Sequence, residues 1–92
     1  MFKEDLLREI LNYCERKRKF FFTYEEFLVF LYHKYGYRVS FGSVARKLRK
    51  LARQGFLIRK KVPIKEWGIG EKVYFFPQRH KIIIYLRKRN KY

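Results

Sequence analysis

The sequence predicts an α+β fold in which three helices, a β-hairpin and a basic tail form one small protein. Three observations support this fold class: apolar residues at helical spacing before residue 55, β-rich segments after it, and a composition that can build a core. The chain has 92 residues, of which 48% are hydrophobic and 21% aromatic. This length suits a single domain, and this apolar content argues against a disordered basic tail.

The first helix is predicted over residues 3–17, where Leu6, Ile10 and Cys14 fall at helical spacing. Cys14 lies on this apolar face and is interpreted as a buried small hydrophobe. Because the chain has one cysteine, a secreted domain held by disulfides is not expected. The aromatic run at residues 20–22 is predicted to form a small strand.

The second helix is predicted to begin at Thr23. Thr23 and Glu26 have the spacing of a capping box, and Phe22 and Phe27 have the spacing of a hydrophobic staple. Gly36 follows the last apolar position of this segment. It supplies the residue in left-handed conformation that commonly ends a helix.

The third helix is predicted over residues 40–54, with Ser40 as its N-cap and Gly55 as its stop. Its apolar stripe consists of Phe41, Val44, Leu48, Leu51 and Ala52. The opposite face is small and basic and consists of Gly42, Ser43, Arg46, Lys47, Arg49, Lys50 and Arg53.

A β-hairpin is predicted after Gly55. Residues 56–62 and 73–76 are β-rich, and the loop between them, residues 63–72, contains turn-forming glycine and proline. Pro77 ends the second strand. The apolar run within residues 78–92 suits a strand, but the length of the tail, the preceding proline and the apolar spacing suit a helix, which we predict.

The charge of the chain is unevenly distributed. There are 24 Lys and Arg against 8 Asp and Glu, giving a net charge of +16. Residues 1–35 carry seven basic and six acidic residues, whereas residues 36–92 carry seventeen basic and two acidic residues. Such a balance predicts a polyanionic partner: DNA, RNA or an anionic membrane surface. The longest apolar run, residues 27–32, is much shorter than the ~20 residues that span a bilayer, so no membrane span is expected.

Three segments resemble the winged helix-turn-helix family: TYEEF at residues 23–27, SFGSVARKL at 40–48 and LARQGFL at 51–57. The resemblance is one of residue types and element order, and it extends over nearly the whole chain. It implies a winged helix-turn-helix domain over residues 1–77, a three-helix core with a β-hairpin wing, followed by a basic, helical tail over residues 78–92. Among such proteins, the compact size suggests small archaeal or archaeal-virus transcription regulators.

The resemblance implies a DNA-binding surface on the third helix and the hairpin. A helix fits the major groove of B-DNA and presents its first turns to the base edges. The residues expected to read bases are Ser43, Arg46, Lys47 and Lys50. Those expected to contact the DNA backbone are Tyr37, Arg38, Ser40, Arg49, Arg53, Arg59, Lys61, Lys65 and Lys72. Trp67 and Ile69 form the wing tip, where the alternatives are contact with a groove wall or packing on the hairpin or another subunit.

The tail has two possible roles. Its candidate contact residues are Ile82, Ile83, Tyr85, Leu86, Arg87 and Arg89. They either pair two subunits in a homodimer and bring charge to DNA, or cover the core of their own monomer against the first helix. Paired subunits would imply DNA half-sites about one helical turn apart.

Catalysis, metals and cofactors find little support in the sequence. His33 and His80 have no second ligand at a recognisable spacing, and Glu25 and Glu26 point apart as neighbours on a helix. We therefore expect no enzyme activity, no metal, no cofactor and no small-molecule ligand, and a cytoplasmic location, nucleoid-associated or in the host cytoplasm if the protein is viral. Few Asn, Gln and Thr beside many Lys, Arg and Ile favour a thermophilic source.

The leading hypothesis is a sequence-specific transcription regulator that binds double-stranded DNA. The second is an architectural or chromatin protein without sequence preference, since phosphate contacts alone give tight binding at low salt. RNA binding and protein binding within a replication or transcription assembly are further alternatives, because a fold does not by itself determine a function.

Overall fold

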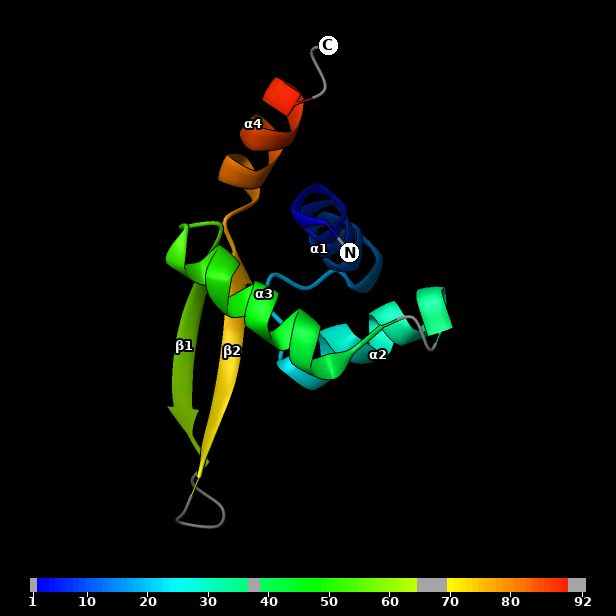
Figure 1. The fold of residues 1–92 in the computed structure, drawn as a ribbon. Coiled ribbons are helices and arrows are strands. Elements are labelled where there is room, and N and C mark those ends of the chain that lie inside the picture. Colours follow the sequence, from blue (N-terminus) through cyan, green and yellow to red (C-terminus); the bar gives the residue numbers. More distant parts are fainter. Residues whose placement is uncertain (1, 37–38, 65–69, 90–92) are drawn as a thin grey trace.

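The computed structural model describes residues 2–36, 39–64 and 70–89. Within these ranges the chain has an α+β fold with four helices and a two-stranded antiparallel hairpin (Figure 1). The elements, in chain order, are α1 (Lys3–Lys17), α2 (Tyr24–Tyr35), α3 (Phe41–Arg53), β1 (Leu57–Pro63), β2 (Glu71–Pro77) and α4 (Arg79–Arg89). The hairpin extends away from the helices, and α4 leaves the opposite end of the molecule (Figure 1).

The predicted N-terminal signals of α2 are confirmed. The Glu26 amide donates to Oγ1 of the Thr23 N-cap at 3.2 Å, and the Thr23 hydroxyl donates to the Glu26 carboxylate at 3.2 Å. The rings of Phe22 and Phe27 stack with centroids 4.7 Å apart, as a hydrophobic staple requires. Gly36 follows the helix with φ +66°, a conformation that costs little only for glycine.

Helix α3 is closed by a Schellman motif at Gly55, which has φ +88°. The Phe56 amide donates to the Leu51 carbonyl at 3.0 Å, and the Gly55 amide donates to the Ala52 carbonyl at 3.1 Å. At the other end, the Ser43 amide donates to the side chain of the Ser40 N-cap at 3.5 Å. These local bonds explain why the limits of α3 follow from the sequence.

The first strand is shifted by one residue from the predicted segment 56–62, and the second is longer than the predicted segment 73–76. They pair from Leu57 opposite Pro77 to Pro63 opposite Glu71. The Ile64 amide donates to the Gly70 carbonyl at 3.1 Å, so the pairing continues one step beyond the strands. Lys72, expected in the loop, therefore lies within β2. The predicted strand at residues 20–22 is a single bridge between Phe22 and Phe75.

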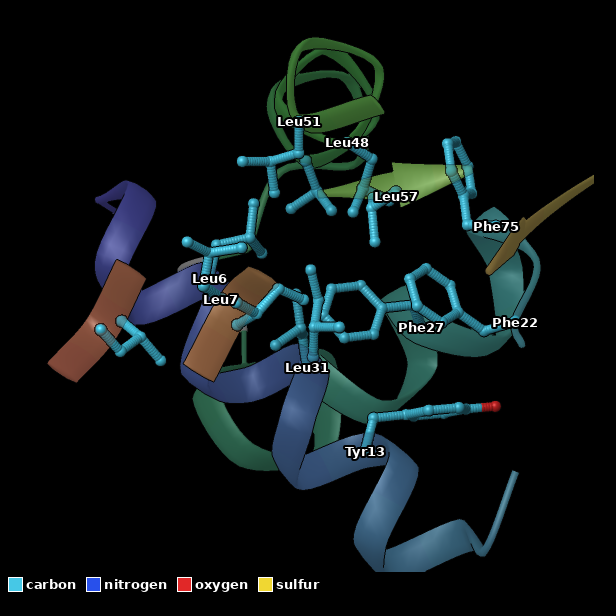
Figure 2. Close-up of a cluster of buried hydrophobic side chains, with 14 residues drawn as sticks. Leu6, Leu7, Tyr13, Phe22, Phe27, Leu31, Leu48, Leu51, Leu57 and Phe75 are labelled. Carbon is cyan, nitrogen blue, oxygen red and sulfur yellow. The ribbon is translucent and has the colours of Figure 1, made fainter. Parts of the chain in front are cut away.

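The core lies where the three N-terminal helices meet the base of the hairpin. Phe22, Phe27 and Phe75 are fully buried, and Tyr13 contacts the first two edge-on (Figure 2). Leucines of α1, α3 and β1 fill the other side of the cluster (Figure 2). One predicted core residue is misplaced: Phe41 is 48% exposed, because it occupies the first turn of α3, at the margin of the core beside Tyr24.

The tail is a helix, as predicted, and it belongs to the core. Ile82 is fully buried and Leu86 is buried, and both pack in the same cluster as the helices. Their side chains are covered by their own chain, as in the alternative in which the tail covers the core of its own monomer. In the described part of the chain, no helix is both long and apolar enough to cross a membrane.

Candidate nucleic-acid interface

One side of helix α3 packs against the core, and the other side faces solvent. Val44, Ala45 and Leu48 are buried along one side. On the opposite side Arg46 and Lys50 are exposed, and Ser43 is half-buried. An added Cβ at Gly42 would meet no atom within 4 Å, so the start of α3 has free space around it. The exposed side of the first turn of α3 thus carries small residues and is accessible, and the following turns carry cations.

The flank of α3 nearest the hairpin carries Arg49 and Arg53. These two side chains line an open hollow of about 690 Å³ together with Arg59 from β1 and Lys81 from α4. We call this hollow, with its four basic side chains, the basic hollow. No acidic side chain lines it. Four cations from three elements therefore share one surface beside the exposed face of α3.

Lys81 is part of this surface through the docking of α4. The Gln78 amide donates to the Phe56 carbonyl at 2.8 Å, which fixes the start of α4 beside the end of α3. Lys81 Nζ then lies 3.3 Å from the position that a Cβ at Gly55 would take. A positive charge is favourable there, because the carbonyl end of a helix is partially negative. Lys81 is not among the individual contact residues predicted from the sequence, since nothing local in the chain indicates where the tail docks.

Lys47 lies on the other flank of α3. It is partly buried and lines a separate hollow of about 250 Å³ with Phe2 and Leu6, at the start of α1. Lys50 borders this hollow as well. The four predicted base-reading residues are therefore not equivalent: Arg46 and Lys50 occupy the centre of the exposed face, whereas Lys47 lies toward α1.

The hairpin separates its cations onto two faces. Arg59 is paired with buried Phe75 and Lys61 with Val73, so both share the face on which the core lies. Lys61 Nζ is 3.9 Å from the Glu71 carboxylate. Lys72 has the opposite parity and lies on the other face. The structure thus brings Arg59 together with α3, but it does not bring Lys72 there.

Five predicted contact residues lie outside the described residues. They are Tyr37, Arg38, Lys65, Trp67 and Ile69. Ser40 is described, and its side chain caps α3. The expected roles of the five residues in DNA binding and in the wing tip stay predictions.

Two of the predicted tail contacts are used within the molecule. The Tyr85 hydroxyl donates to the Glu4 carboxylate at 3.1 Å, and Arg89 Nε lies 3.4 Å from the same carboxylate. A hydrogen bond from the backbone of Glu4 and the one from Tyr85 hold the pKa of the Glu4 carboxyl below its ordinary value. Ile83 is half-buried, and Arg87 is exposed. Arg87 is thus more accessible to an external anion than Arg89, which lies beside Glu4.

The N-terminal helices contain a different kind of charged group. Lys19 forms an ion pair with Glu26, which also accepts the Tyr13 hydroxyl at 3.1 Å. Lys34 Nζ lies 2.9 Å from the Glu9 carboxylate, which is 5% exposed. Each of these two acids is held by a lysine. Among the residues that the structure describes, no three His, Cys, Asp or Glu side chains gather as a metal site would require.

Comparisons of the chain with family models, with curated proteins and with solved structures found no match.

Proposed function

We propose that this chain is a double-stranded-DNA-binding protein of the winged helix-turn-helix type and acts as a sequence-specific transcription regulator. The order α1, bridge at Phe22, α2, α3, β1 and β2 is consistent with such an arrangement. In this proposal α3 enters the major groove, where Arg46 and Lys50 face the bases. The basic hollow then binds the phosphates at the edge of the groove.

The observation that carries the proposal is the convergence of the basic hollow with the exposed face of α3. Arg49, Arg53 and Arg59 form no ion pair with any described acid. Clustered cations repel one another and disfavour the compact state unless a polyanion neutralises them. A duplex supplies closely spaced phosphates along both sides of one groove, which matches cations on the flank of a protruding helix.

A second candidate function is architectural binding without sequence preference. It is favoured by the composition of the exposed face of α3, where the side chains beyond Ser43 are cations. Asn and Gln, which pair with adenine in the major groove, are absent from positions 42, 43, 46, 49, 50 and 53. Arg46 is then the residue that decides between the two candidates, because arginine can donate two hydrogen bonds to guanine.

The test is selection of bound sequences from random duplex DNA, repeated across a salt series. A recovered motif whose preference persists at higher salt supports the regulator. Absence of a motif, with the logarithm of the affinity falling by about 0.9 per phosphate contact for each tenfold rise in salt, supports the architectural candidate. Preference for RNA over duplex DNA contradicts both.

Two variants separate base contacts from phosphate contacts. Arg46→Ala is expected to relax base preference by about 1–3 kcal/mol at one position. Arg59→Ala is expected to weaken all sequences about equally and to lower the salt slope by about 1. Arg16→Ala is the matched control, because Arg16 is an exposed arginine at the end of α1 that lines a different hollow. If Arg46→Ala and Arg16→Ala behave alike, α3 is not the recognition helix.

A further inference from the structure

The hairpin has a second face that the proposed duplex complex does not use. Phe22 and Phe75 point into the core, so by strand alternation their neighbours Phe21, Tyr74 and Phe76 point away from it. The Phe21 ring lies 5.9 Å from the Tyr74 ring and 5.8 Å from the Phe76 ring. We call these three rings, with Lys60 and Lys72, the outer hairpin face.

The three rings are accessible although they form a continuous cluster. Phe21 is 37% exposed, and Tyr74 and Phe76 are each half-buried. The bridge between Phe22 and Phe75 places the segment around residue 22 beside β2, so the rings come from two adjacent segments. An accessible aromatic cluster on a sheet is a surface on which flat groups can stack.

Lysines surround these rings. Lys60 Nζ lies 5.5 Å from the centre of the Phe76 ring, and Lys72 Nζ lies 5.8 Å from the centre of the Tyr74 ring. Neither lysine forms an ion pair with a described residue. A second copy of the chain on this face would bring lysines against lysines across an isologous contact. The charge instead complements an anion that also carries flat apolar groups.

We propose that the outer hairpin face binds single-stranded nucleic acid. Unpaired bases stack on Phe21, Tyr74 and Phe76, and the lysines that cover the rings in the free protein move to the phosphates. Stacking of bases on aromatic side chains tolerates any sequence, because every base has a π-face. In a duplex the bases are stacked on one another, so the outer hairpin face distinguishes unpaired strands from paired ones.

This site is separate from the proposed duplex surface. Lys60 and Lys72 have the opposite strand parity to Arg59 and Lys61, which lie on the core side of the hairpin. Substitutions on one face therefore leave the other intact. The inference does not rest on duplex binding, and either proposal can fail alone.

The test is fluorescence anisotropy with labelled oligothymidylate and oligouridylate of about 12 nucleotides, an abasic strand of the same length, and a duplex. The variant is Phe21→Ala/Tyr74→Ala, which keeps the charge of the protein. Its matched control is Phe2→Ala/Tyr32→Ala, which removes one exposed Phe and one exposed Tyr from other places. We expect the first variant to lose about 10-fold or more in affinity for the single strands without a change in salt slope. The control variant's affinity for the single strands and the first variant's affinity for the duplex should stay within about twofold of the original values.

Other results would overturn the proposal. One is equal binding of the abasic and thymidylate strands by the original protein, since stacking would then contribute nothing. Another is loss of self-association in the Phe21→Ala/Tyr74→Ala variant by sedimentation, which would assign the face to a second copy.

Phe21→Trp, which retains a stacking ring, should keep the single-strand affinity and show that the loss does not come from misfolding. Circular dichroism of both variants confirms the fold. Lys60→Gln/Lys72→Gln should lower the salt slope for single strands by about 1.4.

Discussion

The N-terminal helices and the surface formed by α3, β1 and α4 use charge in opposite ways. In α1 and α2, Glu9 and Glu26 are each held by a lysine and by neutral hydrogen-bond donors. Around the basic hollow, Arg49, Arg53 and Arg59 lie together without a described acid. Removal of one partner from a buried charge pair destabilises a fold, whereas clustered like charges weaken it and are available to a ligand.

The difference predicts which substitutions unfold the protein and which change only its surface. The largest effect is expected in the aromatic core, where the first region meets the hairpin. Phe27→Ala removes a fully buried ring that stacks on Phe22 and should lower the free energy of unfolding by about 3–5 kcal/mol. Urea denaturation measures this loss. Val29→Ala on the same helix, at a residue 53% exposed, should stay within about 0.5 kcal/mol; equal losses would mean that the core is misassigned.

A smaller effect is expected from the Glu26 network. Burial raises the pKa of Glu26, but hydrogen bonds from Lys19 and Tyr13 outweigh it and bring the pKa below its ordinary value of 4.5. Because the folded pKa is the lower one, the stabilisation is fully present above pH 4.5 and is lost as the pH falls through the folded pKa. Glu26→Gln should lower the free energy of unfolding by about 1–2 kcal/mol at neutral pH. It should also reduce the loss of stability between neutral and acidic pH.

The measurement is urea denaturation of the original protein and of the Glu26→Gln variant between neutral and acidic pH. Glu25→Gln on the exposed side of α2 is the control, because the structure shows no ion pair between Glu25 and another described residue. If Glu25→Gln and Glu26→Gln lower the stability equally, the ordered network contributes nothing beyond the charge.

The two helix caps allow a direct comparison of the regions. Thr23 is 2% exposed and accepts the Glu26 amide at 3.2 Å, whereas Ser40 is exposed and accepts the Ser43 amide at 3.5 Å. Thr23→Ala should cost about 1–2 kcal/mol and Ser40→Ala about 0.5 kcal/mol. Thermal unfolding of the two variants gives the order. The reverse order would show that α3 needs its cap more than α2 does.

The smallest effect on stability is expected in the basic hollow. Arg49→Ala/Arg53→Ala removes repulsion between neighbouring cations, so the free energy of unfolding should stay within about 0.5 kcal/mol or rise. Any gain should shrink as salt is added, because salt screens surface charges. Urea denaturation at low and high salt provides the measurement. A loss above about 1 kcal/mol would mean that these arginines hold the fold together.

Much of the helical structure was predictable because its signals are local. α1 occupies the predicted residues, and the limits of α2 and α3 follow from their caps and from Gly36 and Gly55. A cap, a staple and a glycine stop act between residues a few positions apart. The basic face of α3 was predictable for the same reason, since helical periodicity alone places Arg46 and Lys50 together.

Other features depend on contacts between residues that are far apart in the chain. Docking of α4 buried Ile82 and Leu86 and brought Lys81 to Gly55. Pairing of the strands placed Arg59 beside α3 and Lys72 on the opposite face, since a shift of one residue would exchange the two. The helices, their caps and the charge carried by each segment follow from the order of the residues alone. Which of those charges meet on one surface was decided by packing, because that depends on the positions of whole elements and not on their residues alone.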